Sequence, residues 1–341
     1  MPETFQSEIE LSIADPLLEA PDRTVALTRY PRLREFADRL GDTPLVEVPG
    51  PPGGARILAK YEFTNPFGSV KDRTAFALVC RAIATHTGPE PLRLLDASAG
   101  NMARALAGLG ELAGIPMRLV VPAVIPPSLL RAIEKTGAVV ELADAAGGLL
   151  GMIKVCEGIA ERDPGLTPLL QHRNMANIAA HEFGTGAEIL QQLGKDRPAA
   201  WVGAIGTGGT LAGVYRALRE RSPELIVAGV TPSEMPYGTD RAPHSEPRFA
   251  GAGGFGNGLR QPFVETQLPD AAHHHVTYIE ALQGMLEYRR QTGTSIGASA
   301  AAAWLGAKKV AAQLEPGQIV VTLFADAGPE EDWQRAEQSA S

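Results

Sequence analysis

The sequence predicts an α/β protein built from two doubly wound lobes, and three observations carry this prediction. The chain has 341 residues, 44% hydrophobic and 21% charged, so it is long enough to fill two hydrophobic cores. From Thr43 onward, short apolar or β-branched runs alternate with helical stretches, as in parallel sheets with crossover helices. No internal repeat of fixed period replaces this alternation.

The first series of elements predicts the smaller lobe. An apolar helix is expected at 74–84, after a strand at 57–61 that belongs to the larger lobe. Buried strands and intervening helices then follow in alternation, and we expect them at 93–97, 101–113, 117–122, 127–135 and 138–143.

A second series predicts the larger lobe, with strands and helices expected at 199–205, 210–221, 225–231, 279–291, 299–313 and 318–324. Between the strand at 225–231 and the helix at 279–291, residues 233–269 are rich in Pro, Gly and single charges. This composition predicts an irregular loop region bordering the active site. The predicted division is an N-terminal extension (1–40), a smaller lobe (65–174) and a larger lobe (41–64 plus 175–335).

Composition narrows the class of partner and the compartment. Lys plus Arg total 31 against 39 Asp plus Glu, and a net charge of −8 argues against nucleic acid and favours small molecules. Cys80 and Cys156 lie in apolar helix-like stretches, which predicts two packed thiols in a reducing compartment. No signal peptide or membrane span is visible, so we expect a cytoplasmic protein without membrane contact.

The segment Gly206-Thr207-Gly208-Gly209-Thr210 joins a predicted strand to a predicted helix. Glycines allow close backbone approach and the helix N-terminus favours an anion, so this loop predicts a phosphate site. Leu211 stands where the dinucleotide fingerprint requires glycine, which weakens a nucleotide interpretation. A glycine turn without ligand remains the alternative.

Two further turns carry candidate functional side chains. Lys71 lies at a Gly/Ser turn before a helix, where desolvation and the helix dipole would lower its pKa and yield a free amine; an ordinary solvated lysine is the alternative. In Ser98-Ala99-Gly100-Asn101, Asn101 could either cap the next helix or bind a cofactor oxygen.

In this order, the three segments resemble the cysteine synthase and cystathionine β-synthase family of pyridoxal 5'-phosphate (PLP) enzymes. The likeness spans about residues 40–330 and extends to Thr43–Val46, Gln171, Asn174, Asn177 and Gly297–Ser299. It implies the tryptophan synthase β-like fold, known as fold type II, with PLP in the cleft between the lobes. It also implies a homodimer.

The resemblance further implies a role for each matching residue. Lys71 would bind PLP as a Schiff base, Asn101 would bind the 3'-oxygen of the cofactor, and Ser299 would face its pyridine nitrogen. The phosphate would rest on Gly206, Thr207, Gly208, Gly209 and Thr210. The implied reaction is β-replacement on an activated serine through an aminoacrylate, with a small nucleophile as the second substrate.

The substrate loop departs from the family pattern. Cysteine synthases read Thr-Ser-Gly-Asn-Thr where this chain has Ser98, Ala99, Gly100, Asn101 and Met102, so two hydroxyls are lost and Met102 adds apolar bulk. Ser98, Gln171 and backbone N–H groups remain for the substrate carboxylate, an arrangement that argues against ordinary O-acetylserine. The same stretch is similar to serine/threonine dehydratases, so an ammonia-lyase is the alternative to the favoured replacement enzyme.

Other features predict less. His273-His274-His275 cannot converge on one ion in regular structure, and no metal site is expected. Arg241, Arg248 and Arg260 could receive an anionic substrate group, although surface solvation is the expected state.

A catalytically silent binding subunit is a third interpretation of the whole protein, disfavoured because the chain keeps Lys71. The run Asp326-Ala327-Gly328 replaces the family's serine before glycine.

Overall fold

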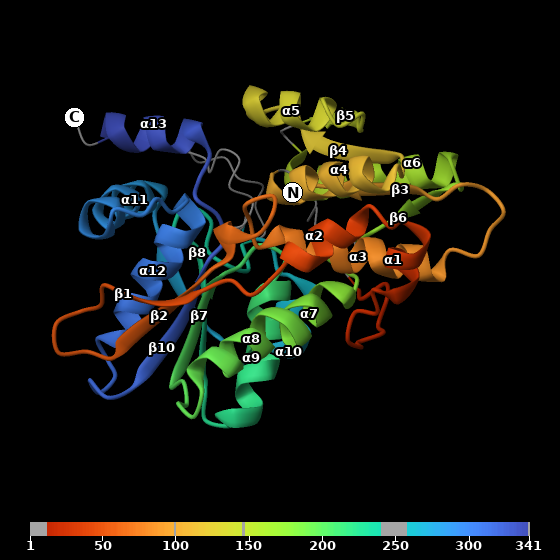
Figure 1. The fold of residues 1–341 in the computed structure, drawn as a ribbon. Helices are drawn as coiled ribbons and strands as arrows, with labels where there is room; N and C mark the ends of the chain where they lie inside the picture. The colour runs from red at the N-terminus through yellow and green to blue at the C-terminus, as the bar shows by residue number, and fades with distance from the viewer. Residues whose placement is uncertain (1–11, 99, 145–146, 240–257, 340–341) are drawn as a thin grey trace, which may run out of the picture.

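The computed structural model describes residues 12–98, 100–144, 147–239 and 258–339, and Figure 1 shows them as two adjoining α/β lobes. The larger lobe contains a six-stranded sheet in the order β1-β2-β10-β7-β8-β9, where β1 is antiparallel to β2 and the remaining pairs are parallel. Its strands are β1 (Leu45–Val48), β2 (Arg56–Tyr61), β7 (Ala200–Ala204), β8 (Ile226–Pro232), β9 (Ala272–Val276) and β10 (Ile319–Phe324).

The smaller lobe contains a four-stranded parallel sheet in the order β5-β4-β3-β6. Its strands are β3 (Arg93–Ala97), β4 (Met117–Pro122), β5 (Val139–Ala143) and β6 (Leu166–Pro168). Four of the helices belong with it: α3 (Lys71–Thr85), α4 (Asn101–Ala113), α5 (Pro127–Glu134) and α6 (Gly148–Arg162).

The remaining helices surround the larger sheet, except for two near the N-terminus (Figure 1). Those two are α1 (Thr24–Arg29) and α2 (Leu33–Arg39). The others are α7 (Ala176–Ala180), a π-helical turn (His181–Gly186), α8 (Ala187–Leu193), α9 (Gly209–Arg221), α10 (Pro262–Gln267), α11 (Tyr278–Thr292), α12 (Ala298–Ala311) and α13 (Glu330–Ser339).

Both sheets are covered on both faces, as parallel sheets require. On one face of the larger sheet, residues of α11 and α12 form a core that includes Trp304 and Tyr288; on the other, α8, α9 and α10 bury Leu211 and Phe263. The alternating side chains of β3 and β4 divide likewise between the α3/α4 side and the α6 side. The α/β fold with two lobes is therefore confirmed, while the boundaries at 40, 65 and 174 stay a prediction.

One interpretation of an irregular segment, 233–269, needs correction, and two other segments form elements that the sequence did not indicate. Residues 24–39 form α1 and α2, and Leu33 and Phe36 are buried, although the region shows no clear period; such short helices are formed by packing on the body. Within 233–269, residues 262–267 form α10, which begins with Pro262 at a helix N-terminus. The three adjacent histidines lie on β9, where successive side chains point to opposite faces of the sheet.

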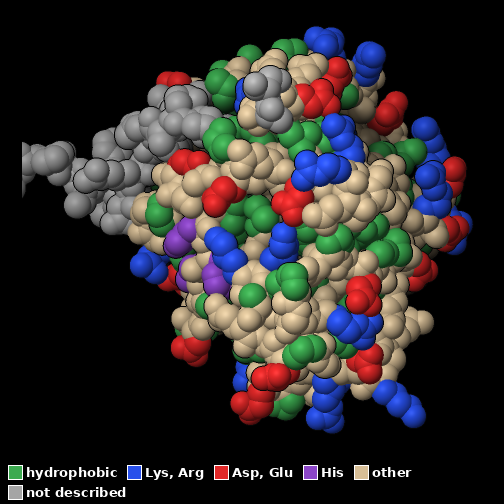
Figure 2. All heavy atoms as spheres, turned by 90° about the vertical axis from the view of Figure 1, so that its left-hand side faces the viewer, with side chains coloured by type: hydrophobic (Ala, Val, Ile, Leu, Met, Phe, Trp, Pro, Cys, Tyr) green, Lys and Arg blue, Asp and Glu red, His purple; other side chains and the backbone are tan. Residues whose placement is uncertain are grey.

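The surface and the thiols agree with the composition. Figure 2 shows acidic and basic side chains interspersed over one face, without a continuous basic stripe. Among the described residues no helix is long and apolar enough to cross a membrane, and no cluster of His, Cys, Asp and Glu is placed to hold a metal. Cys80 and Cys156 are buried free thiols, as predicted, and burial raises the pKa of each to about 12.

Candidate active site

Lys71 is the first residue of α3, and the turn before it is fastened to the larger lobe. The Val70 N–H donates to the Ala325 carbonyl (2.9 Å), directly after β10. The Asp72 carboxylate accepts hydrogen bonds from the Phe67 N–H (2.6 Å) and the Ser69 hydroxyl (3.3 Å). The turn is thus closed from both sides, and the start of α3 holds the lysine at the junction of the two lobes.

A buried ionic network lies beside this turn. Arg73 donates to Glu62 (2.7 and 2.9 Å) and to Glu188 (2.6 and 2.7 Å), and Lys60 pairs with Glu188 at 2.8 Å. Burial raises the pKa of Glu188, but its bonds to Arg73 outweigh this and the pKa falls to about 2. Removing one partner of such a network leaves an uncompensated charge, so these residues anchor the start of α3.

The environment of Lys71 favours the neutral amine. Burial lowers the pKa of its side chain to about 8, and the nearby carboxylate of Asp96 opposes this shift only in part. Burial likewise raises the pKa of Asp96 to about 7. A lysine that loses its proton near pH 8 can attack an aldehyde, which an ordinary lysine does poorly at neutral pH.

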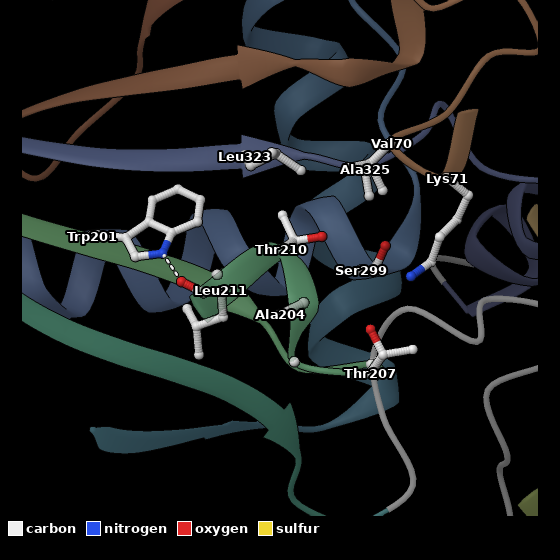
Figure 3. Close-up of a pocket in the computed structure, with 13 residues that line it drawn as sticks. Val70, Lys71, Trp201, Ala204, Thr207, Thr210, Leu211, Ser299, Leu323 and Ala325 are labelled. Atoms are coloured by element: carbon white, nitrogen blue, oxygen red, sulfur yellow. Dashed lines mark hydrogen bonds between the residues drawn. The ribbon is translucent and has the colours of Figure 1, made fainter. Parts of the chain in front are cut away.

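Lys71 faces a pocket under the glycine loop Gly206–Thr210, here called the phosphate loop (Figure 3). Besides Lys71, the pocket gathers these predicted residues: Gly206, Thr207, Gly208, Thr210 and Ser299. Gly208 has φ +81°, and a Cβ there would lie 2.6 Å from Val264 Cγ2. A Cβ on Gly209, where α9 begins, would overlap the amide of Asn177. Only glycine therefore allows this loop its shape and its close approach to a ligand.

The loop rests on a buried network of hydrogen bonds that the sequence did not reveal. Asn177 Nδ2 donates to the Gln171 carbonyl (2.7 Å) and to Thr207 Oγ1 (3.0 Å), which also accepts from the Gly209 N–H (3.2 Å). Since its oxygen already accepts two bonds, the Thr207 hydroxyl can donate its proton to a ligand. His181, kept neutral because burial lowers its pKa, lies 3.2 Å from Thr210 Oγ1.

Ser299 tests whether the site fits the expected cofactor. It lies in the first turn of α12, only 1% exposed, and its Oγ has no hydrogen-bond partner among the described residues. A buried hydroxyl without a partner costs free energy unless a ligand atom completes it. A free amine, a phosphate loop with a hydroxyl donor and an unpaired serine lie in one pocket, an arrangement that fits pyridoxal phosphate.

The substrate loop lies at the end of β3. Ser98 Oγ accepts a bond from the Ala103 N–H (3.1 Å), Gln171 Nε2 donates to the Ala97 carbonyl (2.8 Å), and both side chains are buried. Ala99 lies outside the described residues.

Met102 requires a correction. It is 2% exposed and belongs to the hydrophobic core of the smaller lobe, because the second residue of α4 faces that core. Its side chain does not add bulk beside the substrate.

Asn101 does not line the pocket but holds the two lobes together at its edge. Its Nδ2 donates to Asp326 Oδ2 (2.6 Å), next to the pocket residue Ala325, and its Oδ1 accepts from Arg104 Nη2 (3.0 Å). Asn101 keeps one further N–H for a cofactor oxygen. Asp326 and Arg104 are functional candidates that sequence reasoning missed; the only signal was the unusual Asp326-Ala327-Gly328 run.

The arginines considered for an anionic substrate do not join this site. Arg260 pairs with Glu265 at 3.0 Å on the surface, the solvated alternative considered for it. Arg241 and Arg248 lie outside the described residues.

A cleft lysine beside a phosphate loop, between two such lobes, defines a PLP-dependent enzyme of fold type II. The family model described as "Pyridoxal-phosphate dependent enzyme" matches residues 37–326, and the chain belongs to this family. The predicted cofactor and enzyme class are therefore confirmed.

Several proteins similar to this chain are known. "Cysteine synthase" of Aquifex aeolicus is 33% identical over 88% of this chain and 91% of its own length. "Cysteine synthase B" of Escherichia coli is 32% identical over 85% and 91%. Two solved structures resemble the fold: O-ureido-L-serine synthase (TM-score 0.78, 25% identity, covering 87% and 92%) and the O-acetylserine dependent cystathionine β-synthase of Helicobacter pylori (0.77, 29%, 86% and 94%).

Proposed function

We propose that this enzyme replaces the β-substituent of an O-activated serine with a small nucleophile, giving a β-substituted alanine. The observation that carries the proposal is the Lys71 amine, its pKa lowered to about 8, facing the phosphate loop and Ser299 in one pocket. The cysteine synthase relatives confirm β-replacement on serine derivatives as the reaction class. Beyond this reaction class, we propose an O-activated serine as the first substrate and a small nucleophile as the second.

Several residues would hold the cofactor. The hydroxyls of Thr207 and Thr210 and the N–H groups of the loop would bind its phosphate, and Ser299 Oγ would meet its ring nitrogen. Because serine is neutral, it does not enforce protonation of that nitrogen as a carboxylate would. When bound, PLP supplies an electron-withdrawing ring that acidifies the substrate Cα–H and permits departure of a β-substituent.

The chain itself would move one proton and orient the substrate. Lys71 Nζ, freed when the amino acid binds, would take the Cα proton, since its lowered pKa suits a general base near neutral pH. The hydroxyl proton of Ser98, whose oxygen already accepts from Ala103 N–H, would bind the substrate carboxylate. Asn101 would bind the cofactor oxygen from the edge of the pocket.

Product analysis tests this function directly. The purified holoenzyme is incubated with O-acetyl-L-serine and other O-activated serines, with and without a thiol, and the products are identified by mass spectrometry. We expect a β-substituted alanine that requires the thiol. Keto acid and ammonia as the sole products would reject replacement and support the ammonia-lyase, and Lys71→Ala is the matched control.

We also propose that the enzyme is a homodimer in the cytoplasm that binds neither membranes nor nucleic acid. The support is the family expectation for the dimer, the net charge of −8 against nucleic acid, and the two free thiols for a reducing compartment. Light scattering of the holoenzyme tests the dimer, and a mass of one 36.0 kDa chain would contradict it.

A further inference from the structure

His172 directly follows the substrate-loop candidate Gln171 and contacts Gln261, and the reaction described above leaves its imidazole without a role. His172 is partly buried, and the amide of Gln171 is tied to the end of β3 at Ala97. Its Nδ1 is 2.9 Å from Gln261 Oε1, at the start of α10. Helix α10 in turn packs on the phosphate loop, since Val264 and Phe263 border Gly208. The ring therefore lies between the substrate loop and the phosphate loop.

The tautomer of this imidazole follows from the orientation of Gln261. Gln261 is 1% exposed, and its Nε2 donates to the Leu259 carbonyl at 3.3 Å, which turns Oε1 toward the ring. A carbonyl oxygen can only accept, so His172 Nδ1 carries the proton and Nε2 carries the lone pair. The Gln261 N–H also donates to the Tyr237 hydroxyl (2.9 Å), which holds this part of the chain in place.

The ring is neutral and lies within electrostatic range of the catalytic lysine. Burial lowers the pKa of His172 to about 4. The hydrogen bond to Gln261 opposes this shift, and the positive charge of Lys71 adds to it. Since Nδ1 faces Gln261, Nε2 points away from α10, and it has no hydrogen-bond partner among the described residues. At neutral pH it is an open hydrogen-bond acceptor within electrostatic reach of Lys71.

We propose that His172 Nε2 accepts a hydrogen bond from the X–H group of the incoming nucleophile and directs the lone pair of X at the substrate Cβ. This inference rests on the proposed function and deepens it, because it selects protic nucleophiles such as thiols and amines. The lone pair of X forms the Cβ–X bond, the X–H bond breaks, and its proton leaves through Nε2 to water. His172 is thus a specificity-determining residue for the second substrate.

Two variants separate the two ring nitrogens. His172→Asn keeps a donor near the position of Nδ1 for Gln261 and loses Nε2, whereas His172→Phe loses both. The two stages of the reaction are followed by stopped-flow absorbance of the cofactor, first on adding the O-activated serine and then on adding the nucleophile. Rates are normalised to the concentration of cofactor-bound protein, so both stages can be measured even for a variant that binds the cofactor poorly.

The choice of nucleophile makes the test specific. 2-Mercaptoethanol at pH 7 carries an S–H, and azide at that pH carries no proton. We expect both variants to leave the first stage within about twofold, to slow the thiol stage about tenfold, and to leave the azide stage within about twofold, as for one lost hydrogen bond. Equal slowing with thiol and azide, or no slowing with thiol, would overturn the role of Nε2.

A second readout needs no catalysis. Nitrogen-15 spectra of the protein without cofactor, with His172→Asn to assign the signal, should show a neutral ring protonated on Nδ1; an Nε2–H tautomer would overturn the inference. Failure of the proposed function looks different, because a wild-type holoenzyme that forms no β-substituted alanine from any nucleophile would fail before His172 is tested.

Discussion

The phosphate loop and the substrate loop both join a strand to a helix, yet they are held in different ways. Gly206–Thr210 is shaped by its own backbone and supported from below by Asn177 and His181, so its polar atoms already face the pocket. The loop before α4 instead sends Asn101 across to Asp326 of the other lobe. The first loop is thus an anion site built into one lobe, whereas the second depends on how the two lobes meet.

Lys71 lines the pocket together with the phosphate loop, and its removal should have the largest effect. Lys71→Ala removes the nucleophilic amine and the proposed base, so turnover should fall at least about 10³-fold. Borohydride reduction and peptide mass analysis should find a pyridoxyl adduct on the Lys71 peptide of the wild type and none in the variant. The surface variant Lys309→Ala should behave as wild type, and an adduct elsewhere would contradict the assignment.

Restoring the family hydroxyl at Met102 tests the substrate loop. Because Met102 lies in the core, Met102→Thr should lower the free energy of unfolding by about 2–4 kcal/mol without improving substrate affinity. Urea denaturation and the KM for the amino acid measure the two effects. Met102→Leu, the volume-matched control, should cost less than about 1.5 kcal/mol. A lower KM with unchanged stability would show that the side chain at position 102 contacts the substrate.

Filling the cradle of the phosphate loop should weaken the cofactor rather than the fold. In Gly209→Ala the new methyl group displaces Asn177, and we expect PLP to dissociate about 10- to 100-fold more readily. Equilibrium dialysis of the cofactor measures this effect. Gly151→Ala, in α6 with open space around it, is the matched control and should bind PLP normally. Unchanged affinity in Gly209→Ala would contradict the phosphate site.

The smallest expected effect is a pH dependence of cofactor loading. The pKa of Lys71 is lowered to about 8, so the free amine fraction rises about tenfold between pH 7 and pH 9 and then levels off. The rate of cofactor loading, followed by absorbance, should rise in parallel.

The lowered pKa of Lys71 also makes the free energy of unfolding depend on pH. Between about pH 8 and 10.5 the unfolded chain binds more protons than the folded chain, so the protein without cofactor gains stability as pH rises through that window.

The control for this pH dependence is Lys71→Met, which has no amine to desolvate. Its free energy of unfolding should exceed that of the wild type below pH 8, and the difference should shrink toward pH 10.5. A constant difference across the window would show that Lys71 keeps an ordinary pKa.

Much of the fold was predictable because its signals are local. Seven strands and four long helices follow from periodicity, and their ends agree with the expected ranges within about two residues: β2, β3, β4, β5, β7, β8, β10, α4, α9, α11 and α12. The short helices α1, α2 and α10 were missed because helices of this length take their stability from tertiary packing. The same holds for β9, whose three histidines have no strand-like alternation.

The site divides in the same way. Gly206–Thr210, Lys71 and Ser299 were found from strand–turn–helix patterns and family resemblance, and the structure brings them into one pocket. The orientation of Met102 and the supporting roles of Asn177 and His181 were not predictable, because they depend on which face of a helix meets a core or a loop.

The sequence by itself determined the class of chemistry. Glycine-rich turns at strand ends and one lysine at a helix start are short-range features, and a parallel sheet necessarily gathers its strand ends along one edge. Tertiary structure alone decided the partners of the reacting groups. Asn101 meets Asp326 across 225 residues of chain and His172 meets Gln261 across 89, and the burial that lowers the pKa of Lys71 exists only once the lobes close over it.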